Sequence, residues 1–121
     1  MKKQDTSDEV ANIVYLSIGS NLGNKVLNIE KTKYLLLRKN IKILYCSSFY
    51  ETLSWPNPKF PRFLNIVIKI NTTLDPKDLF LLIKSIEKKI GRKKSAKNYP
   101  RLCDIDIIDF NNKNLNFSSK D

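Results

Sequence analysis

The stretch FLNIVIKIN, residues 63–71, decides the fold that this sequence predicts. Side chains of a β-strand point alternately to its two faces, so residues two apart share a face. One face of this stretch carries only Leu and Ile, at positions 64, 66, 68 and 70. The other carries Phe63, Asn65, Val67 and Lys69. The sequence therefore predicts a strand with an aliphatic face in the core and a mixed face turned away from it.

Three segments before this strand follow from the same reasoning. Residues 13–18 alternate between apolar and polar side chains and predict a strand. Residues 19–24, GSNLGN, have turn chemistry, and the last of them can cap a helix that runs to about Arg38. Residues 41–51 are rich in Ile, Tyr and Phe and predict another strand, while the three prolines of residues 53–61 predict a loop.

A second helix and a last strand follow. The pair Asp75-Pro76 suits a helix start, and Gly91 suits its end. A stripe at helical spacing should pack on the sheet: Leu79, Ile83, Ile86 and Ile90. Residues 92–97 then form a basic loop before a strand at 102–110. The order βαββαβ predicts an α+β fold, a ferredoxin-like sandwich whose four-stranded, mainly antiparallel sheet carries two helices on one face.

Composition limits the domain count and the kind of ligand. With 121 residues and 41% hydrophobic content, the chain predicts one domain, residues 12–121, behind a flexible N-terminal tail at 1–11. The formal net charge of +10 favours anionic ligands, namely nucleotide phosphates, nucleic acid or, less favoured, a membrane surface. No apolar run approaches the roughly 18 residues of a membrane helix, so we expect a soluble, cytoplasmic protein. Cys46 and Cys103 lack metal spacing and are expected to be reduced.

Asp104 and Asp106 form an Asp-x-Asp pair inside the last predicted strand and therefore face the same side. Two carboxylates cannot occupy a dry core without partners, because burying an unpaired charge is very costly. If the aliphatic residues face the helices, the pair shares the open sheet face with Ser17, Phe63 and Asn65. The pair can bind Mg²⁺, which prefers oxygen ligands, or form salt bridges with nearby lysines, and the pattern leaves both open.

The basic run at 92–97, with Arg101 beyond it, suits the phosphates of a nucleotide, although such runs are also common on solvated surfaces. The chain has no His, which excludes a Ser-His-Asp triad. Residues 19–23 lack the Gly-Lys-Ser/Thr ending of a phosphate-binding loop. Trp55 can cover a flat ligand or serve as an exposed anchor in its loop.

Taken together, these motifs resemble the 6-hydroxymethyl-7,8-dihydropterin pyrophosphokinases of folate biosynthesis. The resemblance extends from Asn12 to about Asn114 and rests on blocks in the family's order: YLSIGSNLG at 15–23, SSFYET at 47–52, FLN at 63–65, Gly91-Arg92, Pro100-Arg101 and DID at 104–106.

The resemblance implies transfer of pyrophosphate from ATP to the hydroxymethyl group of the pterin, giving AMP. It implies catalytic roles for Arg92, Arg101, Asp104 and Asp106, with the two aspartates binding two Mg²⁺ ions. The implied pterin pocket consists of Thr52, Leu53, Trp55, Phe63 and Asn65, in which the Phe63 ring stacks on the pterin and Asn65 binds its polar edge. The implied ATP site consists of Glu87, Arg92, Lys94, Lys97, Arg101 and Ile107, where Lys94 replaces a second family arginine. We expect a monomer that binds neither nucleic acid nor membrane.

Family members continue into a segment with a Pro-His motif, further arginines and a pterin-contacting aromatic residue, and residues 114–121 contain none of these. We therefore expect a pyrophosphokinase-like domain truncated at its C-terminal end. Two other functions stay open. One is a catalytically impaired remnant that binds pterin or ATP. The other is a ferredoxin-like RNA-binding module, against which the aspartates argue because they would repel phosphates on the central strands.

Overall fold

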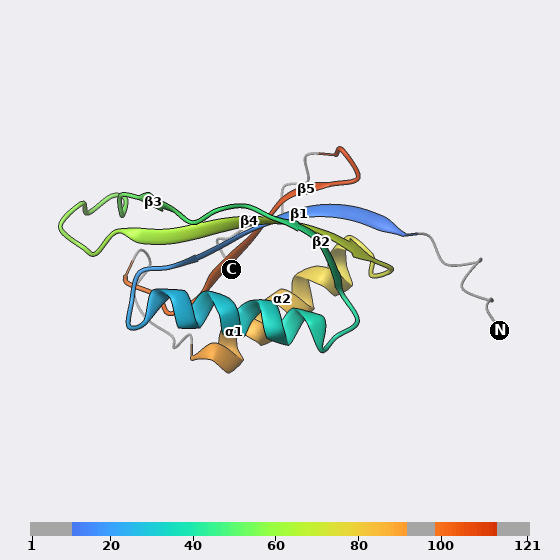
Figure 1. The fold of residues 1–121 in the computed structure, drawn as a ribbon, viewed down its shortest axis with the longest axis horizontal. Helices are drawn as coiled ribbons and strands as arrows, with labels where there is room; N and C mark the ends of the chain where they lie inside the picture. The colour runs from blue at the N-terminus through green and yellow to red at the C-terminus, as the bar shows by residue number, and fades with distance from the viewer. Residues whose placement is uncertain (1–10, 92–98, 114–121) are drawn as a thin grey trace.

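The structure is a computed structural model that describes residues 11–91 and 99–113. An antiparallel sheet is built around β1 (Asn12–Ser20) and β4 (Phe63–Thr72), which pair along their whole lengths. β2 (Lys42–Cys46) and β3 (Tyr50–Thr52) both pair with the far side of β4. β5 (Asp104–Phe110) pairs with β1, so the strand order is β2-β4-β1-β5 (Figure 1).

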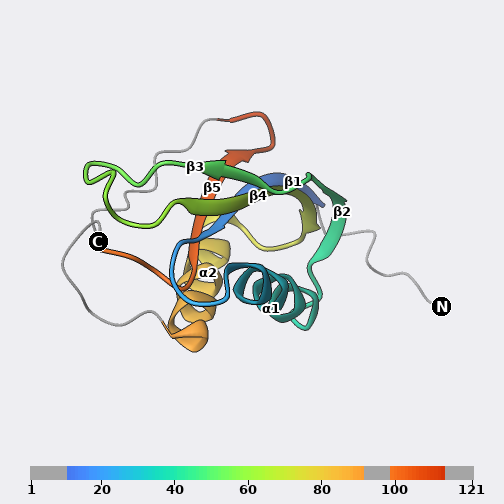
Figure 2. The same ribbon diagram turned by 60° about the vertical axis from the view of Figure 1, so that its left-hand side comes forward.

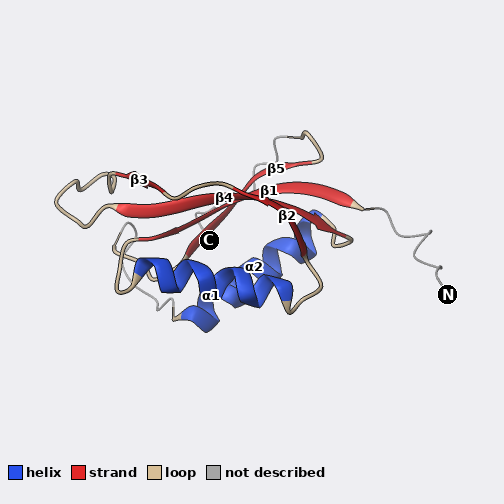
Figure 3. Cartoon of the chain, in the orientation of Figure 1, coloured by secondary structure: helices blue, strands red, loops and turns tan. Residues whose placement is uncertain are grey.

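Two helices, α1 (Lys25–Leu37) and α2 (Pro76–Ile90), cover the same face of this sheet (Figures 1 and 3). Seen from the side, they lie next to each other under the strands (Figure 2). The predicted aliphatic face of β4 supplies Ile66, Ile68 and Ile70 to the core between the layers. Burial of aliphatic side chains between two layers is the main favourable contribution to such a fold. The α+β class and the placement of the two helices are confirmed.

The helix ends agree with the capping chemistry in the sequence. The Asn24 side chain accepts a hydrogen bond from the Leu27 N–H at 3.0 Å, and the Asp75 carboxylate accepts one from the Asp78 N–H at 2.8 Å. Each side chain thereby satisfies a backbone donor that has no partner inside the helix. Gly91 ends α2 with a φ of 129°, a conformation that glycine adopts without the strain other residues would have.

The register of β1 determines which side chains meet on the open face of the sheet. Gly19 lies opposite Asn65 of β4 on one side and opposite Asp104 of β5 on the other. Ser17 lies opposite Asp106. The predicted open face therefore exists, with Asn65 and Asp104 separated by the width of one strand.

Two predicted strands differ from the structure. The single strand expected at 41–51 is divided into β2 and β3, and Ser47 lies between them. Its backbone N–H donates to the Val67 carbonyl and its hydroxyl accepts from the Val67 N–H, both at 2.9 Å, so a side chain replaces part of the ladder. β5 begins at Asp104 rather than Leu102, because the backbone of Arg101 pairs with Asn21 instead of with β1.

Among the strands that the structure describes, β5 lies at an edge of the sheet, next to β1. The sequence argument against RNA binding placed the aspartates on the central strands, and that placement was wrong because β1 is the one described strand that pairs with β5. Within the described residues, no helix is long and apolar enough to span a membrane.

We expect Ile83→Ala to lower the free energy of unfolding by about 2–5 kcal/mol, because it leaves a cavity at a core position that is 1% exposed. Leu81→Ala is the matched control. Leu81 lies on the same helix with 56% of its surface exposed, and its truncation should change stability by roughly 0.5 kcal/mol or less. Urea unfolding followed by circular dichroism measures both. Equal losses for the two variants would contradict the assigned core face of α2.

Candidate functional site

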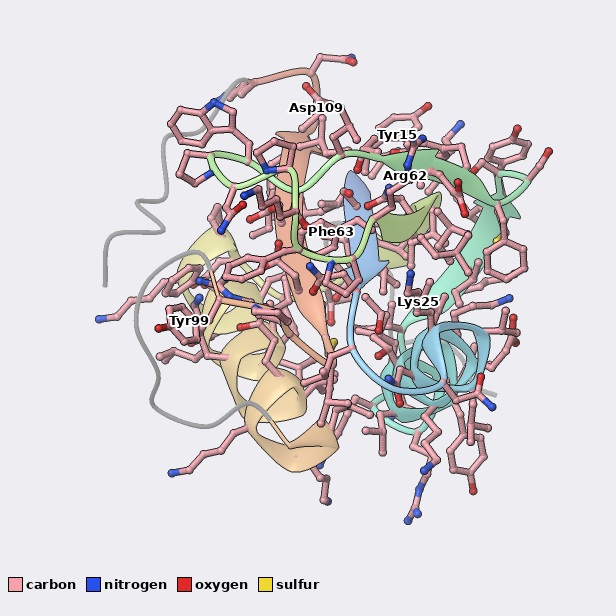
Figure 4. The ribbon with its side chains drawn as sticks, turned by 90° about the vertical axis from the view of Figure 1, so that its left-hand side faces the viewer. Tyr15, Lys25, Arg62, Phe63, Tyr99 and Asp109 are labelled. Carbon is pink, nitrogen blue, oxygen red and sulfur yellow. The ribbon has the colours of Figure 1, made fainter. Side chains whose placement is uncertain are left out.

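An aromatic ring and an amide form the first half of the site, at the end of the sheet where β4 begins. The Asn65 Nδ2 group donates to the Thr52 hydroxyl at 3.0 Å and to the Tyr50 carbonyl at 3.3 Å. These bonds turn the Asn65 Oδ1 atom toward β1, above Gly19. Phe63 lies two residues earlier on the same face, and Figure 4 shows it near the centre of this end of the molecule.

Gly19 provides the room that these two side chains occupy. A Cβ atom built on Gly19 would lie 2.7 Å from Asn65 Oδ1 and 3.3 Å from Phe63 Cδ1. The first distance is shorter than any normal contact between carbon and oxygen, so any side chain at this position would displace the amide. The absence of a side chain at residue 19 thus lets Asn65 Oδ1 and the Phe63 ring lie directly over β1.

Of the residues predicted for the pterin pocket, the structure brings three together, Thr52, Phe63 and Asn65. Leu53 and Trp55 follow directly on the adjoining loop, with exposed fractions of 57% and 81%. Their side chains therefore lie at the rim of the site in this structure.

Asp104 and Asp106 form the second half of the site, across β1 from Asn65. The Arg101 guanidinium lies 3.2 Å from the Asp104 carboxylate, so the acid pair has an ion-pair partner three residues before it in the chain. From the sequence we expected that any salt bridge of the aspartates would involve a nearby lysine. Among the described residues, the side chain that forms an ion pair with Asp104 is Arg101.

The environment of Asp106 disfavours its negative charge. Partial burial raises the pKa of its carboxyl group, and repulsion from Asp104 and Glu87 raises it further, against the opposing effect of Lys84 and Arg101. The described residues form no group of three or more metal-binding side chains. Two carboxylates with excess negative charge are, however, what Mg²⁺ uses when water and phosphate oxygens complete its coordination.

Glu87 and Ile107, both predicted for the ATP site, do not share the open face with the acid pair: Glu87 bonds to the backbone of β5, and Ile107 is the β5 residue after Asp106 and packs against the core. Glu87 is 1% exposed, and its Oε2 atom accepts a 2.7 Å hydrogen bond from the Ile105 N–H, between the two aspartates. Its Oε1 atom lies 3.4 Å from the Lys84 ammonium. Ile107 lies opposite Leu16 and packs against the core. Glu87 thus anchors the edge strand, and the nucleotide roles of both residues stay predictions.

The segment that carries Arg101 is fixed on three sides. Leu102 packs between two glycines: added Cβ atoms would lie 3.2 Å from it at Gly23 and 2.9 Å at Gly91. The next residue, Cys103, is buried, and its sulfur lies 3.2 Å from the Thr32 hydroxyl. Arg92, Lys94 and Lys97, together with the rest of the predicted basic loop, lie outside the described residues, and their roles stay predictions.

Sequence reasoning missed two residues of the site, Gly19 and Asn21, because it interpreted residues 19–24 only as a turn. Gly19 is the last but one residue of β1, and Asn21, 2% exposed, bonds to both halves of the site. The alternation of β1 was the available signal, since extending it by two residues places Gly19 on the open face with Ser17.

Comparison with known proteins agrees with this geometry. Residues 15–117 match the family described as 7,8-dihydro-6-hydroxymethylpterin-pyrophosphokinase (HPPK). The chain belongs to this family.

Several curated relatives have related names. The chain is 41% identical over 95 residues to the 2-amino-4-hydroxy-6-hydroxymethyldihydropteridine pyrophosphokinase of Aquifex aeolicus. The aligned residues cover 78% of this chain and 59% of that protein. The chain is 33% identical over 105 residues to the enzyme of the same name from Bacillus subtilis, covering 86% of this chain and 63% of that protein. It is also 36% identical to the folic acid synthesis protein fol1 of Pneumocystis carinii, covering 98% of this chain and 16% of that protein. The chain thus spans less than two thirds of each of these relatives.

We expect Gly19→Ala to weaken binding of 6-hydroxymethylpterin by about tenfold to a hundredfold, because the new methyl group would displace Asn65 Oδ1 from the position in which it would bind the pterin. Pterin fluorescence titration measures the affinity. Lys69→Ala, on the same face of β4 but opposite Tyr15, is the matched control and should bind like the parent. Parent-like affinity in Gly19→Ala would show that the site does not need this space.

Without Mg²⁺, Asp106→Asn should be more stable than the parent at pH 7. The folded-state pKa of Asp106 is raised, so the ionised carboxylate disfavours the folded state above that pKa, and the asparagine removes this cost. The advantage should shrink as the pH falls through the raised pKa, because the parent then becomes protonated. Thermal melts in EDTA between pH 7 and pH 4 measure the difference. A variant less stable than the parent at pH 7 would contradict the assignment.

Proposed function

We propose that this chain transfers pyrophosphate from ATP to 6-hydroxymethyl-7,8-dihydropterin, giving AMP and the pterin diphosphate. The observation that carries the proposal is the register around Gly19, which puts the Phe63 ring with the Asn65 amide and the acid pair on one sheet face, one strand apart. Membership of the pyrophosphokinase family supports the same reaction.

In this proposal the pterin ring stacks on Phe63, while Leu53 and Trp55 cover it from the exposed loop. Asn65 is suited to bind the polar edge of the pterin, because its Nδ2 group is already bonded to Thr52 and Tyr50 while its Oδ1 atom lies over Gly19 on the face shared with Phe63. The amide orientation is thereby fixed before the ligand arrives. A site prepared in this way selects a ring that presents N–H donors at that edge.

Asp104 and Asp106 would hold two Mg²⁺ ions that arrive with ATP. When bound, the metals neutralise phosphate charge and orient the phosphates for in-line attack. The pKa of Asp106, raised by burial and by repulsion from Asp104 and Glu87, supports this role, because a nearby cation would stabilise the ionised carboxylate. Arg101, already beside Asp104, would contact the phosphates, together with Arg92, Lys94 and Lys97. Glu87 would hold the strand between the metal ligands in place.

The reaction needs no strong protein base. The hydroxyl oxygen of the pterin bonds to the β-phosphorus, the bond from that phosphorus to the α,β-bridging oxygen breaks, and the hydroxyl proton passes to solvent. The contribution of the chain is to hold both substrates at the correct distance and to offset the charge that develops on the transferred group.

We further propose a ferredoxin-like sandwich, which the strand order β2-β4-β1-β5 supports when β3 is counted as an extension of the β2 edge. We propose a cytoplasmic monomer that binds no nucleic acid. The carboxylates on the open face of β5 support the last point, since they repel a phosphate backbone unless metal is bound.

A coupled assay of AMP release, with and without the pterin, tests the proposed function. We expect pterin-dependent AMP release that falls by several orders of magnitude in Asp104→Ala and in Asp106→Ala, because each change removes a metal ligand. Asp109→Ala, further along the same face of β5, should retain most activity. Circular dichroism checks that the variants fold. Pterin or ATP binding without AMP release would favour the impaired remnant, and salt-sensitive RNA binding without ATP binding would favour the RNA-binding module.

A further inference from the structure

Asn21 connects the two halves of the site. It follows the last residue of β1 and is 2% exposed, so its polar atoms need protein partners. Those partners lie on segments far apart in the sequence: Ser54 and Pro61 at the two ends of the loop before β4, and Arg101 before β5.

Toward the phosphate side, Asn21 pairs with the backbone of Arg101 through two hydrogen bonds. The Asn21 N–H donates to the Arg101 carbonyl at 3.0 Å, and the Arg101 N–H donates to Asn21 Oδ1 at 2.7 Å. This pair fixes the position of the Arg101 peptide. The guanidinium of Arg101 forms the ion pair with Asp104, so Asn21 fixes the backbone from which the Arg101 side chain extends to Asp104.

Toward the pterin side, Asn21 closes the base of the exposed loop. Its Nδ2 group donates to the Ser54 hydroxyl at 2.9 Å and to the Pro61 carbonyl at 3.1 Å, and the Ser54 hydroxyl donates to the same carbonyl at 2.6 Å. Next to this cluster, the Lys25 ammonium donates to the Arg62 carbonyl at 2.7 Å. The chain is thus held immediately before Phe63, and Figure 4 shows Lys25, Arg62 and Phe63 close together at this end of the sheet.

The partners determine which way the Asn21 amide points. The Arg101 N–H can only donate and the Pro61 carbonyl can only accept, so the oxygen must face Arg101 and the nitrogen must face the loop. Both amide protons and the oxygen are used. Aspartate could accept from Arg101 but would offer the loop no donor and would place a charge among acceptors, while serine would be too short for both partners.

A second contact spans the same gap. The rings of Phe60, in the loop, and Tyr99, two residues before Arg101, meet edge to face with their centroids 5.8 Å apart. The loop and the Arg101 segment are therefore adjacent at two places, a buried polar contact at Asn21 and an aromatic contact at the surface.

We propose that Asn21 is a positioning residue that sets the distance between the pterin pocket and the Arg101–Asp104 ion pair. The inference rests on the proposed function, because it assigns the pterin to one segment and the phosphates to the other. Asn21 touches neither reacting group. It acts through Ser54 and Pro61 on the pterin side and through the Arg101 backbone on the phosphate side, and an error of about 1 Å between reacting groups can cost a hundredfold in rate.

The test is a comparison of kcat and KM in Asn21→Asp and Asn28→Asp. Asn28 is a matched control: it is also a buried asparagine whose Nδ2 group makes two hydrogen bonds, to Ser20 and Leu22, and within the described residues these bonds reach neither the loop nor Arg101. Asn21→Asp should lower kcat about tenfold to a hundredfold and raise the pterin KM, because the loop loses its two hydrogen-bond donors. The ATP KM should change by less than about threefold, because a carboxylate at residue 21 still accepts the hydrogen bond from the Arg101 N–H. Asn28→Asp should leave both KM values and kcat within about threefold of the parent, at a comparable loss of thermal stability.

Two further measurements separate the possible failures. Titration of the parent with 6-hydroxymethylpterin and with a non-hydrolysable ATP analogue tests the proposed function itself. A parent protein that binds neither ligand does not have the proposed function. If the parent binds and turns over both substrates, equal effects of Asn21→Asp and Asn28→Asp on kcat and KM, in proportion to lost stability, would overturn the positioning role. Ser54→Ala should reproduce the pterin KM effect of Asn21→Asp in part, since it removes one of the two loop partners.

Discussion

The antiparallel register of β1 between β4 and β5 is the constraint on which the rest of the structure depends. Because side chains alternate along a strand, a shift of one residue would move Asp104 and Asp106 into the helix-covered face and Ile105 onto the open face. The aliphatic residues of β1 and β4 make that shift prohibitive, since Val14, Leu16 and Ile18 are fully buried against the helices. The same register brings Asn65 and Asp104 to opposite sides of Gly19. The core thus positions the site.

Asp106 occupies a place that disfavours its negative charge. Glu87 satisfies the outward backbone N–H of Ile105, which protects an edge strand, but it adds a third carboxylate near Asp106. Burial, together with repulsion from Asp104 and Glu87, raises the pKa of Asp106, and Lys84 and Arg101 offset this effect only in part. A site that holds uncompensated negative charge in the folded protein binds a cation more strongly, because the cation relieves that unfavourable charge. The same charge lowers the stability of the folded protein when no cation is bound.

The sequence predicted whatever depends on periodicity and local capping. The alternation of residues 63–71, the caps at Asn24 and Asp75, and the shared face of Phe63, Asn65 and the aspartates all have short-range causes, and the structure confirms them. Periodicity could not reveal that residues 41–51 form two strands. The break at Ser47 depends on its hydroxyl accepting a hydrogen bond from the Val67 N–H, and Val67 lies 20 residues away in the sequence. Nor could it reveal Asn21, whose partners lie 33 to 80 residues away.

Residues 19–21 show how much a short segment can carry when consecutive side chains point in different directions. Gly19 faces the open side and leaves space for Asn65. Ser20 faces the interior, where its hydroxyl accepts from Asn28 at the start of α1. Asn21, beyond the end of the strand, extends between the loop and Arg101. Space, helix attachment and the connection between the two halves of the site thus come from three adjacent residues, and each contribution requires a different side chain. A pattern that suggests only a turn is therefore compatible with a segment in which Gly19 and Asn21 serve the site while Ser20 serves the attachment of the helix.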